Sequence, residues 1–409
     1  MSAPSLDRHK ISFVLLEGIH ESAVETLARA GYTNVVRYPG ALEGAALAKA
    51  VSKAHFLGIR SRSRMTAEVL AGAGRLNAIG CFCIGTNQVD LEAARGAGIP
   101  VFNAPFSNTR SVAELVVGEI ILLMRGIFEK NAALHRGQWR KSARDSFEVR
   151  GKLLGIVGYG HIGTQVGILA EALGMQVLYY DIEKKLSLGN ARRAASLEQL
   201  LDEADVVTLH LPETPMTRGL FGTSQFECMR PGAVLINTSR GSVVEIDALV
   251  ASLRSGRLRG AALDVFPQEP QSAQEEFLSP LRDFDNVLLT PHVGGSTLEA
   301  QRNIGAEVAE KLLRYSDNGS TIAAVNFPQV ALPELAGKHR LLHIHRNIPG
   351  IMARVNGVFS DRRINIAGQA LQTDSEIGYV VIDIDQEHSQ TALRLLKQIP
   401  GTLRCRVLH

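Results

Sequence analysis

The stretch Gly158-Tyr-Gly-His-Ile-Gly163 follows the apolar run Lys152–Val157 and precedes a segment with apolar residues at helical spacing. A second apolar run, Gln176–Tyr180, then ends in Asp181. A bound dinucleotide requires these elements in this order: a strand, a glycine turn, a helix, a second strand and an acidic residue. The glycines let the backbone approach the pyrophosphate, the helix N-terminus meets its charge, and the acid accepts from a ribose hydroxyl. The pattern therefore predicts a dinucleotide site rather than a simple tight turn, with contacts from Gly158, Gly160, His161, Ile162, Gly163 and Asp181.

Asp181 also bears on which dinucleotide is bound. Its carboxylate repels a 2′-phosphate, which favours NAD over NADP. Lys184 and Lys185 lie nearby in the sequence and weaken this argument. NAD is the predicted cofactor.

Size and charge restrict the class of protein. A chain of 409 residues with 45% hydrophobic content is large enough for two or three domains with buried cores. The net charge is only +3 and Lys or Arg form no long run, so nothing indicates nucleic acid as a partner. The apolar stretches are too short to cross a membrane, and the N-terminus lacks the apolar core of a signal peptide. We expect a cytoplasmic protein.

The four cysteines form no Cys-x-x-Cys pair; they are Cys81, Cys83, Cys228 and Cys405. We expect buried free thiols in a reducing compartment and no metal centre, with a metal or redox site as the alternative.

Short apolar runs alternate with helical patterns along most of the chain, which predicts α/β architecture with parallel sheets covered by helices. We expect strands at Ile11–Leu16, Ala54–Ile59, Ala78–Cys83 and Val101–Asn103, and one long helix from Ser111 to His135. Residues 1–108 and 295–328 are predicted to form one discontinuous, substrate-binding domain. Residues 109–294 are predicted to form a doubly wound cofactor domain inserted into it, with a cleft between the two.

The C-terminal region has a different pattern. Residues 329–338 carry Pro and Gly without periodicity and predict a linker, with Gly337 as the expected hinge. Residues 339–409 then read as strand, helix, strand, strand, helix, strand, which predicts a separate ferredoxin-like βαββαβ domain.

Three ionisable residues come just after predicted strands of the cofactor domain: Arg240 after Ala233–Asn237, Glu269 after Gly260–Val265, and His292 after Asn286–Thr290. The carboxyl ends of parallel strands meet at one edge, so the three are expected to converge there. Histidine suits proton transfer near neutral pH, a carboxylate fixes its tautomer, and an arginine binds a substrate carboxylate. Taken singly, each residue also fits a surface, turn or capping position. Together they predict hydride transfer between NAD and an alcohol.

At these residues the chain resembles the D-2-hydroxyacid dehydrogenase family, in Ser239-Arg-Gly241, Leu263-Asp-Val-Phe-Pro-Gln-Glu-Pro270 and Thr290-Pro-His-Val-Gly-Gly-Ser-Thr297. The resemblance implies His292 as acid/base, Glu269 as its partner and Arg240 as the carboxylate anchor. It also places Asp264 close to the nicotinamide. Further implied cofactor contacts are Thr238, Ser239, Arg240, His292, Gly294 and Gly295.

Earlier segments narrow the resemblance: Ile59-Arg-Ser-Arg-Ser63, Ile84-Gly-Thr-Asn-Gln-Val-Asp90 and Asn103-Ala-Pro-Phe-Ser-Asn-Thr-Arg-Ser-Val-Ala-Glu114. They are similar to the branch that oxidises 3-phospho-D-glycerate to 3-phosphohydroxypyruvate, the first step of the phosphorylated route to L-serine. Reduction of 2-oxoglutarate is an implied side activity.

Arg60, Ser61 and Arg62 follow a predicted strand and suit a dianionic phosphate, with Ser63 supplying a second hydroxyl; a pair of solvated arginines is the alternative. Asn108 is expected to reach the cleft. Lys141 either contacts a neighbouring subunit's substrate or is a plain surface residue.

The segment His343-Ile-His-Arg-Asn-Ile-Pro-Gly350 resembles that of an ACT regulatory domain. The resemblance implies L-serine as an inhibitor, bound by His345, Asn347 and Asn365 where two such domains pair, and a homotetramer. Arg346 is a local departure, and a helix-capping role for Asn347 is the alternative. Two other functions stay open for the whole chain: a dehydrogenase of another 2-hydroxy acid, and an NAD-sensing corepressor without turnover.

Overall fold

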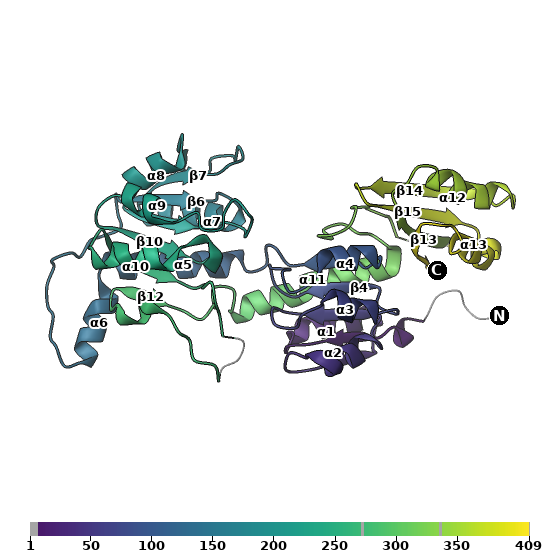
Figure 1. The fold of residues 1–409 in the computed structure, drawn as a ribbon, viewed down its shortest axis with the longest axis horizontal. Helices are drawn as coiled ribbons and strands as arrows, with labels where there is room; N and C mark the ends of the chain where they lie inside the picture. The colour runs from purple at the N-terminus through teal and green to yellow at the C-terminus, as the bar shows by residue number, and fades with distance from the viewer. Residues whose placement is uncertain (1–6, 271–273, 335–337, 409) are drawn as a thin grey trace. The chain divides into compact units, whose positions relative to one another are not determined.

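The computed structural model describes residues 7–270, 274–334 and 338–408. These residues form two compact units, Met1–Ser107 with Gln301–His409, and Asn108–Ala300 (Figure 1). The predicted α/β class, with two parallel sheets and a smaller antiparallel one, is confirmed. Gly337, the predicted hinge, lies outside the described residues.

The first unit contains a five-stranded parallel sheet in the order β2-β1-β3-β4-β5. Its strands are β1 (Phe13–Leu15), β2 (Val35–Arg37), β3 (Phe56–Ile59), β4 (Ala78–Cys81) and β5 (Val101–Asn103). Helices α1 (Glu21–Arg29), α2 (Gly44–Val51), α3 (Ala67–Ala71), α4 (Leu91–Gly96) and α11 (Leu298–Asn318) accompany it. The sequence pattern predicted four of these strands and missed β2, whose three residues are not buried.

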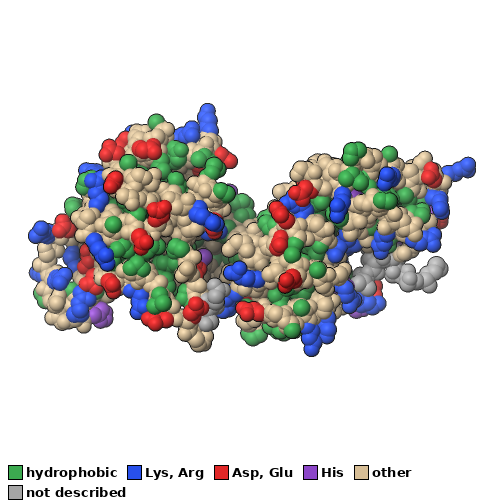
Figure 2. All heavy atoms as spheres, viewed as in Figure 1, with side chains coloured by type: hydrophobic (Ala, Val, Ile, Leu, Met, Phe, Trp, Pro, Cys, Tyr) green, Lys and Arg blue, Asp and Glu red, His purple; other side chains and the backbone are tan. Residues whose placement is uncertain are grey.

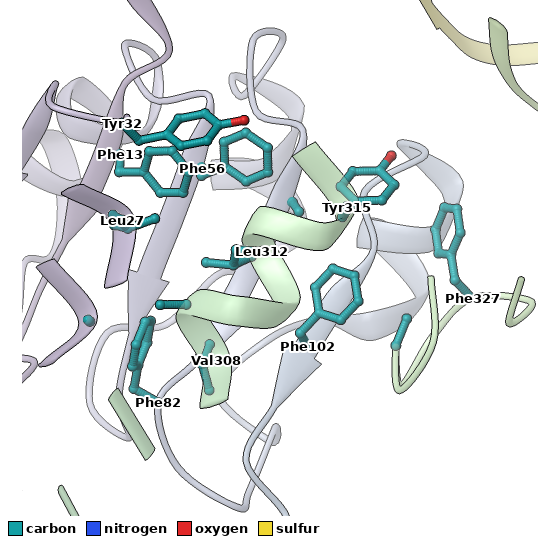
Figure 3. Packing of buried hydrophobic residues seen from close by; sticks show 14 of the residues in the cluster. Phe13, Leu27, Tyr32, Phe56, Phe82, Phe102, Val308, Leu312, Tyr315 and Phe327 are labelled. Atoms are coloured by element: carbon teal, nitrogen blue, oxygen red, sulfur yellow. The ribbon is translucent and has the colours of Figure 1, made fainter. Parts of the chain in front are cut away.

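Alternate residues of these strands enter two different cores, as a sheet covered on both faces requires. Phe13 and Phe56 pack with α1 and α11 (Figure 3). Leu15 lies in the same core. Val14 and Leu57 pack with α2, α3 and α4. The two faces fix the register of the sheet, because a shift by one residue would exchange them.

The second unit contains a seven-stranded sheet in the order β12-β11-β10-β9-β6-β7-β8. Its strands are β6 (Leu153–Val157), β7 (Gln176–Tyr180), β8 (Arg192–Arg193), β9 (Val206–Leu209), β10 (Ala233–Asn237), β11 (Leu258–Leu263) and β12 (Val287–Leu289). Helices α7 (His161–Ala172), α8 (Leu197–Glu203), α9 (Thr223–Cys228) and α10 (Ile246–Arg254) connect them. All seven strands pair in parallel. The order changes direction between β6 and β9, which is where such sheets bind ligands.

The predicted single helix from Ser111 to His135 is wrong. The structure has two helices, α5 (Thr109–Met124) and α6 (Ile127–His135). Gly126 separates them with φ +58°, a left-handed conformation that glycine adopts without steric cost.

The C-terminal residues form an antiparallel sheet in the order β14-β15-β13-β16. Its elements are β13 (His339–Arg346), α12 (Ile351–Ser360), β14 (Ile366–Thr373), β15 (Ile377–Ile384), α13 (Ser389–Leu396) and β16 (Thr402–Leu408). Leu341 and Val380 pack against α12 and α13 on one face. On the other face, Leu342 and Tyr379 share a core with α11 of the parallel-sheet domain.

On the face shown in Figure 2, basic and acidic side chains alternate over each unit and do not gather in one basic patch. Among the helices that the structure describes, none combines the length and the hydrophobicity needed to span a bilayer. Contrary to the prediction that all four cysteines are buried, Cys228 is exposed and Cys83 only partly buried, whereas Cys81 and Cys405 are buried.

Candidate active site

The glycine turn after β6 is shaped by close backbone packing at two of its glycines. A Cβ on Gly158, where φ is +92°, would lie 2.4 Å from the carbonyl oxygen of His210. A Cβ on Gly163 would lie 2.2 Å from the carbonyl oxygen of Gly158. Around Gly160, by contrast, a Cβ would meet nothing within 4 Å. This open backbone precedes His161 and Ile162, whose N–H groups begin α7, so the turn suits an incoming pyrophosphate.

Asp181 is bound to the same turn. Its Oδ2 accepts from the backbone N–H of Tyr159 at 2.8 Å, and its Oδ1 accepts from that of Glu183 at 2.9 Å. These bonds hold a half-buried carboxylate at the end of β7, beside the glycine turn, where a ribose hydroxyl is expected.

The loop after β10 is held by a residue that the sequence reasoning missed, Asn237. It is fully buried, and its Oδ1 accepts from the N–H of Ser239 at 3.0 Å and from its hydroxyl at 2.8 Å. Its Nδ2 donates to the carbonyl of Arg240 at 3.0 Å. A polar residue ending the otherwise apolar strand Ala233–Asn237 was the available signal. The Thr238 hydroxyl is buried and makes no hydrogen bond with the described residues, which suits a contact to a bound cofactor.

Asp264 holds the loop that carries His292. The residue is only 1% exposed; its Oδ1 accepts from the Thr290 hydroxyl at 2.6 Å and from the Val293 amide at 2.8 Å. Its Oδ2 accepts from the Gly294 amide at 2.8 Å. In this structure both oxygens of Asp264 are therefore engaged in shaping the loop. Gly295 packs against Asn108, because a Cβ there would lie 2.3 Å from the Asn108 side-chain nitrogen.

His292 and Glu269 form a hydrogen-bonded pair. The His292 Nδ1 lies 2.9 Å from one carboxylate oxygen of Glu269 and 3.1 Å from the other. A carboxylate only accepts, so Nδ1 carries the proton and Nε2 is the acceptor in the neutral ring. His292 also has a left-handed backbone, φ +55°, which is uncommon for a residue with a side chain.

The pair changes the protonation of both groups. The hydrogen bond that His292 donates to Glu269, opposed by burial and assisted by the charges of Glu269 and Asp264, raises the pKa of His292 above its ordinary value. Burial alone would raise the pKa of Glu269, but the hydrogen bond and charge of His292, with a bond from the Phe266 amide, lower it. The pair therefore consists of a carboxylate and a histidine poised to hold a proton. The positive charge of Arg240 acts to lower the pKa of both Glu269 and His292.

The predicted substrate residues Arg60, Ser61 and Arg62 follow β3 in the first unit. Arg62 and Ser61 are exposed and Arg60 is half-buried, and within the described ranges neither guanidinium forms an ion pair. The expectation that Ser63 supplies a second hydroxyl is wrong. Ser63 is fully buried, and its Oγ accepts from the Leu42 amide at 3.4 Å.

Two further predicted substrate residues belong to the second unit. Asn108 is 9% exposed and precedes α5, and its Oδ1 is buried without a partner among the described residues. Lys141 is exposed on the irregular segment after α6, and no hydrogen bond or ion pair engages it in the described part of the chain.

The residues predicted to bind L-serine do not converge within one chain. His345 is fully buried on β13, with its ring over Gly378. Asn347 and Asn365 are exposed. Asn365 immediately precedes Ile366 of β14. Ile366 pairs with Ile384 of β15, and Ile384 pairs in turn with His339 of β13. His345 lies six residues further along β13 than His339. That places Asn365 about 20 Å from His345 along the sheet, at ~3.3 Å per residue.

The alternative role of Asn347 as a helix cap is wrong. Its Nδ2 donates to the Asp374 carbonyl at 2.7 Å, and the N-cap of α12 is Gly350.

A family model described as the NAD binding domain of D-isomer specific 2-hydroxyacid dehydrogenases matches residues 117–294, and an AHAS small subunit-like ACT domain model matches residues 341–404. The crystal structure of TT0316 protein from Thermus thermophilus is 35% identical with a TM-score of 0.66, covering 74% of this chain and 96% of that one. The D-lactate dehydrogenase of Aquifex aeolicus, solved with NAD and lactic acid, is 25% identical with a TM-score of 0.69, covering 78% and 100%. The chain therefore belongs to the family of D-isomer specific 2-hydroxyacid dehydrogenases, and it is an NAD-dependent oxidoreductase with a C-terminal ACT domain.

Relatives of full length point to one branch of the family. The D-3-phosphoglycerate dehydrogenase of Haemophilus influenzae is 60% identical over 405 residues, which is 99% of either chain. The D-3-phosphoglycerate dehydrogenase of Escherichia coli is 58% identical over 411 residues, which is 100% of either chain.

Proposed function

We propose that this protein oxidises 3-phospho-D-glycerate to 3-phosphohydroxypyruvate with NAD. The hydrogen-bonded His292–Glu269 pair carries the proposal of alcohol oxidation, because it presents an imidazole Nε2 ready to accept a proton. The two bacterial relatives of full length, both D-3-phosphoglycerate dehydrogenases, support the phosphorylated substrate.

The chemistry is divided among three side chains of the second unit. NAD, when bound, would supply the acceptor for the hydride that leaves the substrate carbon. The Arg240 guanidinium binds the substrate carboxylate and polarises the reacting oxygen. His292 Nε2 takes the hydroxyl proton, and Glu269 stabilises the imidazolium that results.

The cofactor is held by the residues that surround the glycine turn and the loops after β10 and β12. Gly158, Gly160, His161, Ile162 and Gly163 bind the pyrophosphate, and Asp181 binds a ribose hydroxyl. The remaining proposed cofactor contacts are Thr238, Ser239, Arg240, Asp264, His292, Gly294 and Gly295.

The phosphate is bound by Arg60 and Arg62 with the Ser61 hydroxyl. Two guanidinium groups without an ion-pair partner among the described residues suit a dianion, and each charge-assisted hydrogen bond contributes about 1.5–3 kcal/mol. Asn108 and Lys141 complete the proposed substrate contacts.

L-Serine is proposed to inhibit the enzyme through the ACT domain. His345 and Asn347 lie at one end of the sheet and Asn365 at the other. A serine molecule contacting all three therefore requires two ACT domains, paired about a two-fold axis with His345 and Asn347 from one copy and Asn365 from the other. Pairing of this kind within a homotetramer, in the cytoplasm, is part of the proposal.

The test is steady-state kinetics with NADH absorbance as the readout. The wild-type protein is expected to oxidise 3-phosphoglycerate, to lose rate when L-serine is added, and to reduce 2-oxoglutarate only as a side activity. His292→Ala should lower kcat by about 10²–10⁴ while NADH binding, followed by fluorescence, is retained. Replacing Arg60 and Arg62 by alanine should raise KM for the phosphorylated substrate. An unchanged KM in that double variant contradicts the phosphate assignment.

A further inference from the structure

Glu17 is a buried carboxylate at the carboxyl end of the first parallel sheet. It comes two residues after β1, it is 4% exposed, and it forms no ion pair with any residue that the structure describes. A buried carboxylate without a cationic partner needs several hydrogen-bond donors to offset its lost hydration.

Those donors are backbone amides of one loop. Glu17 Oε1 accepts from the N–H of Arg60 at 3.1 Å and from that of Ser63 at 2.9 Å. Its Oε2 accepts from the N–H of Arg62 at 3.0 Å. Three of the four amides between Arg60 and Ser63 thus converge on one side chain.

The loop is held from a second direction as well. Gln88 Nε2 donates to the Arg60 carbonyl at 2.6 Å, and the buried Ser63 hydroxyl accepts from the Leu42 amide at 3.4 Å. The backbone of Arg60–Ser63 is therefore fixed, while the side chains of Ser61 and Arg62 remain exposed.

Glu17 adopts this position at a conformational cost. Its φ is +61°, in the left-handed region that residues with a Cβ occupy uncommonly. The backbone there is fixed by its neighbours, since the Glu17 amide donates to the Gly40 carbonyl at 3.0 Å and the Leu16 amide to the Gly58 carbonyl at 2.9 Å. Strained backbone of this kind persists where the surroundings determine it, and it concentrates at functional sites.

We infer that Glu17 is a positioning residue for phosphate recognition, one that holds the Arg60–Ser63 loop so that the guanidinium groups of Arg60 and Arg62 meet the substrate phosphate. Because three loop amides are bonded to Glu17, the phosphate is recognised mainly through side chains and not through a cradle of backbone N–H groups. The inference rests on the proposed function, since it assigns the phosphate to Arg60 and Arg62.

The first test compares two substrates in the Glu17→Gln variant. An amide group places its NH₂ against a backbone N–H, so at least one of the three bonds is lost. We expect KM for 3-phosphoglycerate to rise about tenfold or more, which is the effect expected from the loss of one charge-assisted hydrogen bond. The kcat with 3-phosphoglycerate, and the KM for unphosphorylated D-glycerate, should stay close to their wild-type values. Glu25→Gln, which changes an exposed carboxylate on α1, is the matched control. Equal increases in KM for both substrates, or no increase, overturn the inference.

Chemical rescue provides a second measurement. Glu17→Gly relieves the left-handed strain and leaves a small cavity beside three amides, which added formate can fill with a carboxylate. Formate should lower the raised KM for 3-phosphoglycerate in Glu17→Gly and leave it unchanged in Glu25→Gln. Retained NADH fluorescence shows that the cofactor unit is folded. A raised KM that formate does not lower indicates a merely structural role and overturns the inference.

The Arg60→Ala/Arg62→Ala variant distinguishes a failure of the proposed phosphate site from a failure of the proposed role of Glu17. If its KM for 3-phosphoglycerate stays at the wild-type value, the phosphate site and the role of Glu17 are both overturned. If its KM rises while that of Glu17→Gln does not, only the role of Glu17 is overturned.

Discussion

In the proposed mechanism, the contact between His292 and Glu269 sets the pH dependence of proton transfer. Its hydrogen bond raises the pKa of His292 above 6.5. With His292 as the proposed acid/base, oxidation of the alcohol would need the neutral ring, so its rate should fall as the pH drops through this raised pKa. Reduction of the keto acid would need the protonated ring, and its rate should fall as the pH rises through the same value.

Glu269→Gln should move this titration. The substitution removes the carboxylate charge and the acceptor that favour protonated His292, so the His292 pKa falls. The acid limb of kcat/KM for oxidation should therefore shift to lower pH, with a reduced plateau because the ring is less firmly oriented. Profiles measured in both directions check this, with Glu276→Gln, an exposed carboxylate in the same unit, as the control. An acid limb that does not move would show that the pair does not govern proton transfer.

The loop after β10 depends on a glycine whose neighbours are backbone atoms. A Cβ on Gly241 would lie 2.0 Å from the carbonyl carbon of Phe266, and backbone yields less easily than the end of a side chain. We expect Gly241→Ala to lower the free energy of unfolding by more than ~2 kcal/mol and to displace Arg240.

Gly160→Ala is the contrasting variant, because a Cβ there meets nothing within 4 Å. It should keep the wild-type unfolding temperature of the protein without cofactor and weaken NADH binding. Equal unfolding temperatures for both variants would contradict this.

Helix α5 buries an acid in the core of the cofactor unit. Glu119 is 1% exposed, and neither carboxylate oxygen has a hydrogen-bond partner among the described residues. Burial, with a smaller effect of the Asp264 charge, raises the pKa of Glu119 to about 8. The unfolded chain releases this proton near pH 4.5, so stability falls as the pH rises from about 4.5 to about 8 and is level above that.

Glu119→Gln should remove this dependence. The neutral amide has nearly the same shape, so we expect the variant to match wild type near pH 4 and to exceed it above pH 8, by on the order of 5 kcal/mol at most. Denaturant unfolding at several pH values measures the effect. Glu114→Gln, an exposed change on the same helix, should leave the curve unchanged. Parallel curves for wild type and Glu119→Gln would be the contrary result.

The sequence predicted those elements and site residues that depend on local pattern. The strands β6, β7 and β10 have long apolar runs, and the Gly158–Gly163 turn has its own signature. Residues whose roles depend on contacts with distant parts of the chain could not be predicted from local pattern. Gly126 divides α5 from α6 through its backbone conformation, and the exposed strands β2 and β8 carry no apolar alternation. Asn237 and Glu17 act by bonding to loops, and nothing in their local pattern shows which loop they reach.

Within the first unit, the ACT sheet is joined to the parallel-sheet part by more than its linker. Tyr379 donates to the Gly319 carbonyl at 2.6 Å, and it shares a core with Tyr315 and Phe327. Arg340, 2% exposed, binds both oxygens of Asp383 at 2.7 Å and also donates to the carbonyls of Asn318 and Pro333. A tail hinged only at its linker would not bury an arginine in this way. The ACT sheet and α11 therefore share one core, and we expect them to unfold together.

Ending the chain after Glu334 tests this joint core. Truncation exposes Tyr315 and Phe327 and leaves the Gly319 carbonyl without its donor, so we expect a lower unfolding temperature and a tendency to aggregate. The truncated protein is therefore a poor test of inhibition by serine. Asn347→Ala is the better variant, because Asn347 is exposed and its side chain bonds only to the Asp374 carbonyl among the described residues. It should keep the wild-type unfolding temperature and kcat while losing sensitivity to L-serine in the NADH assay. A truncated chain as stable as the full one would show that the ACT sheet is an independent module, and that α11 does not need it.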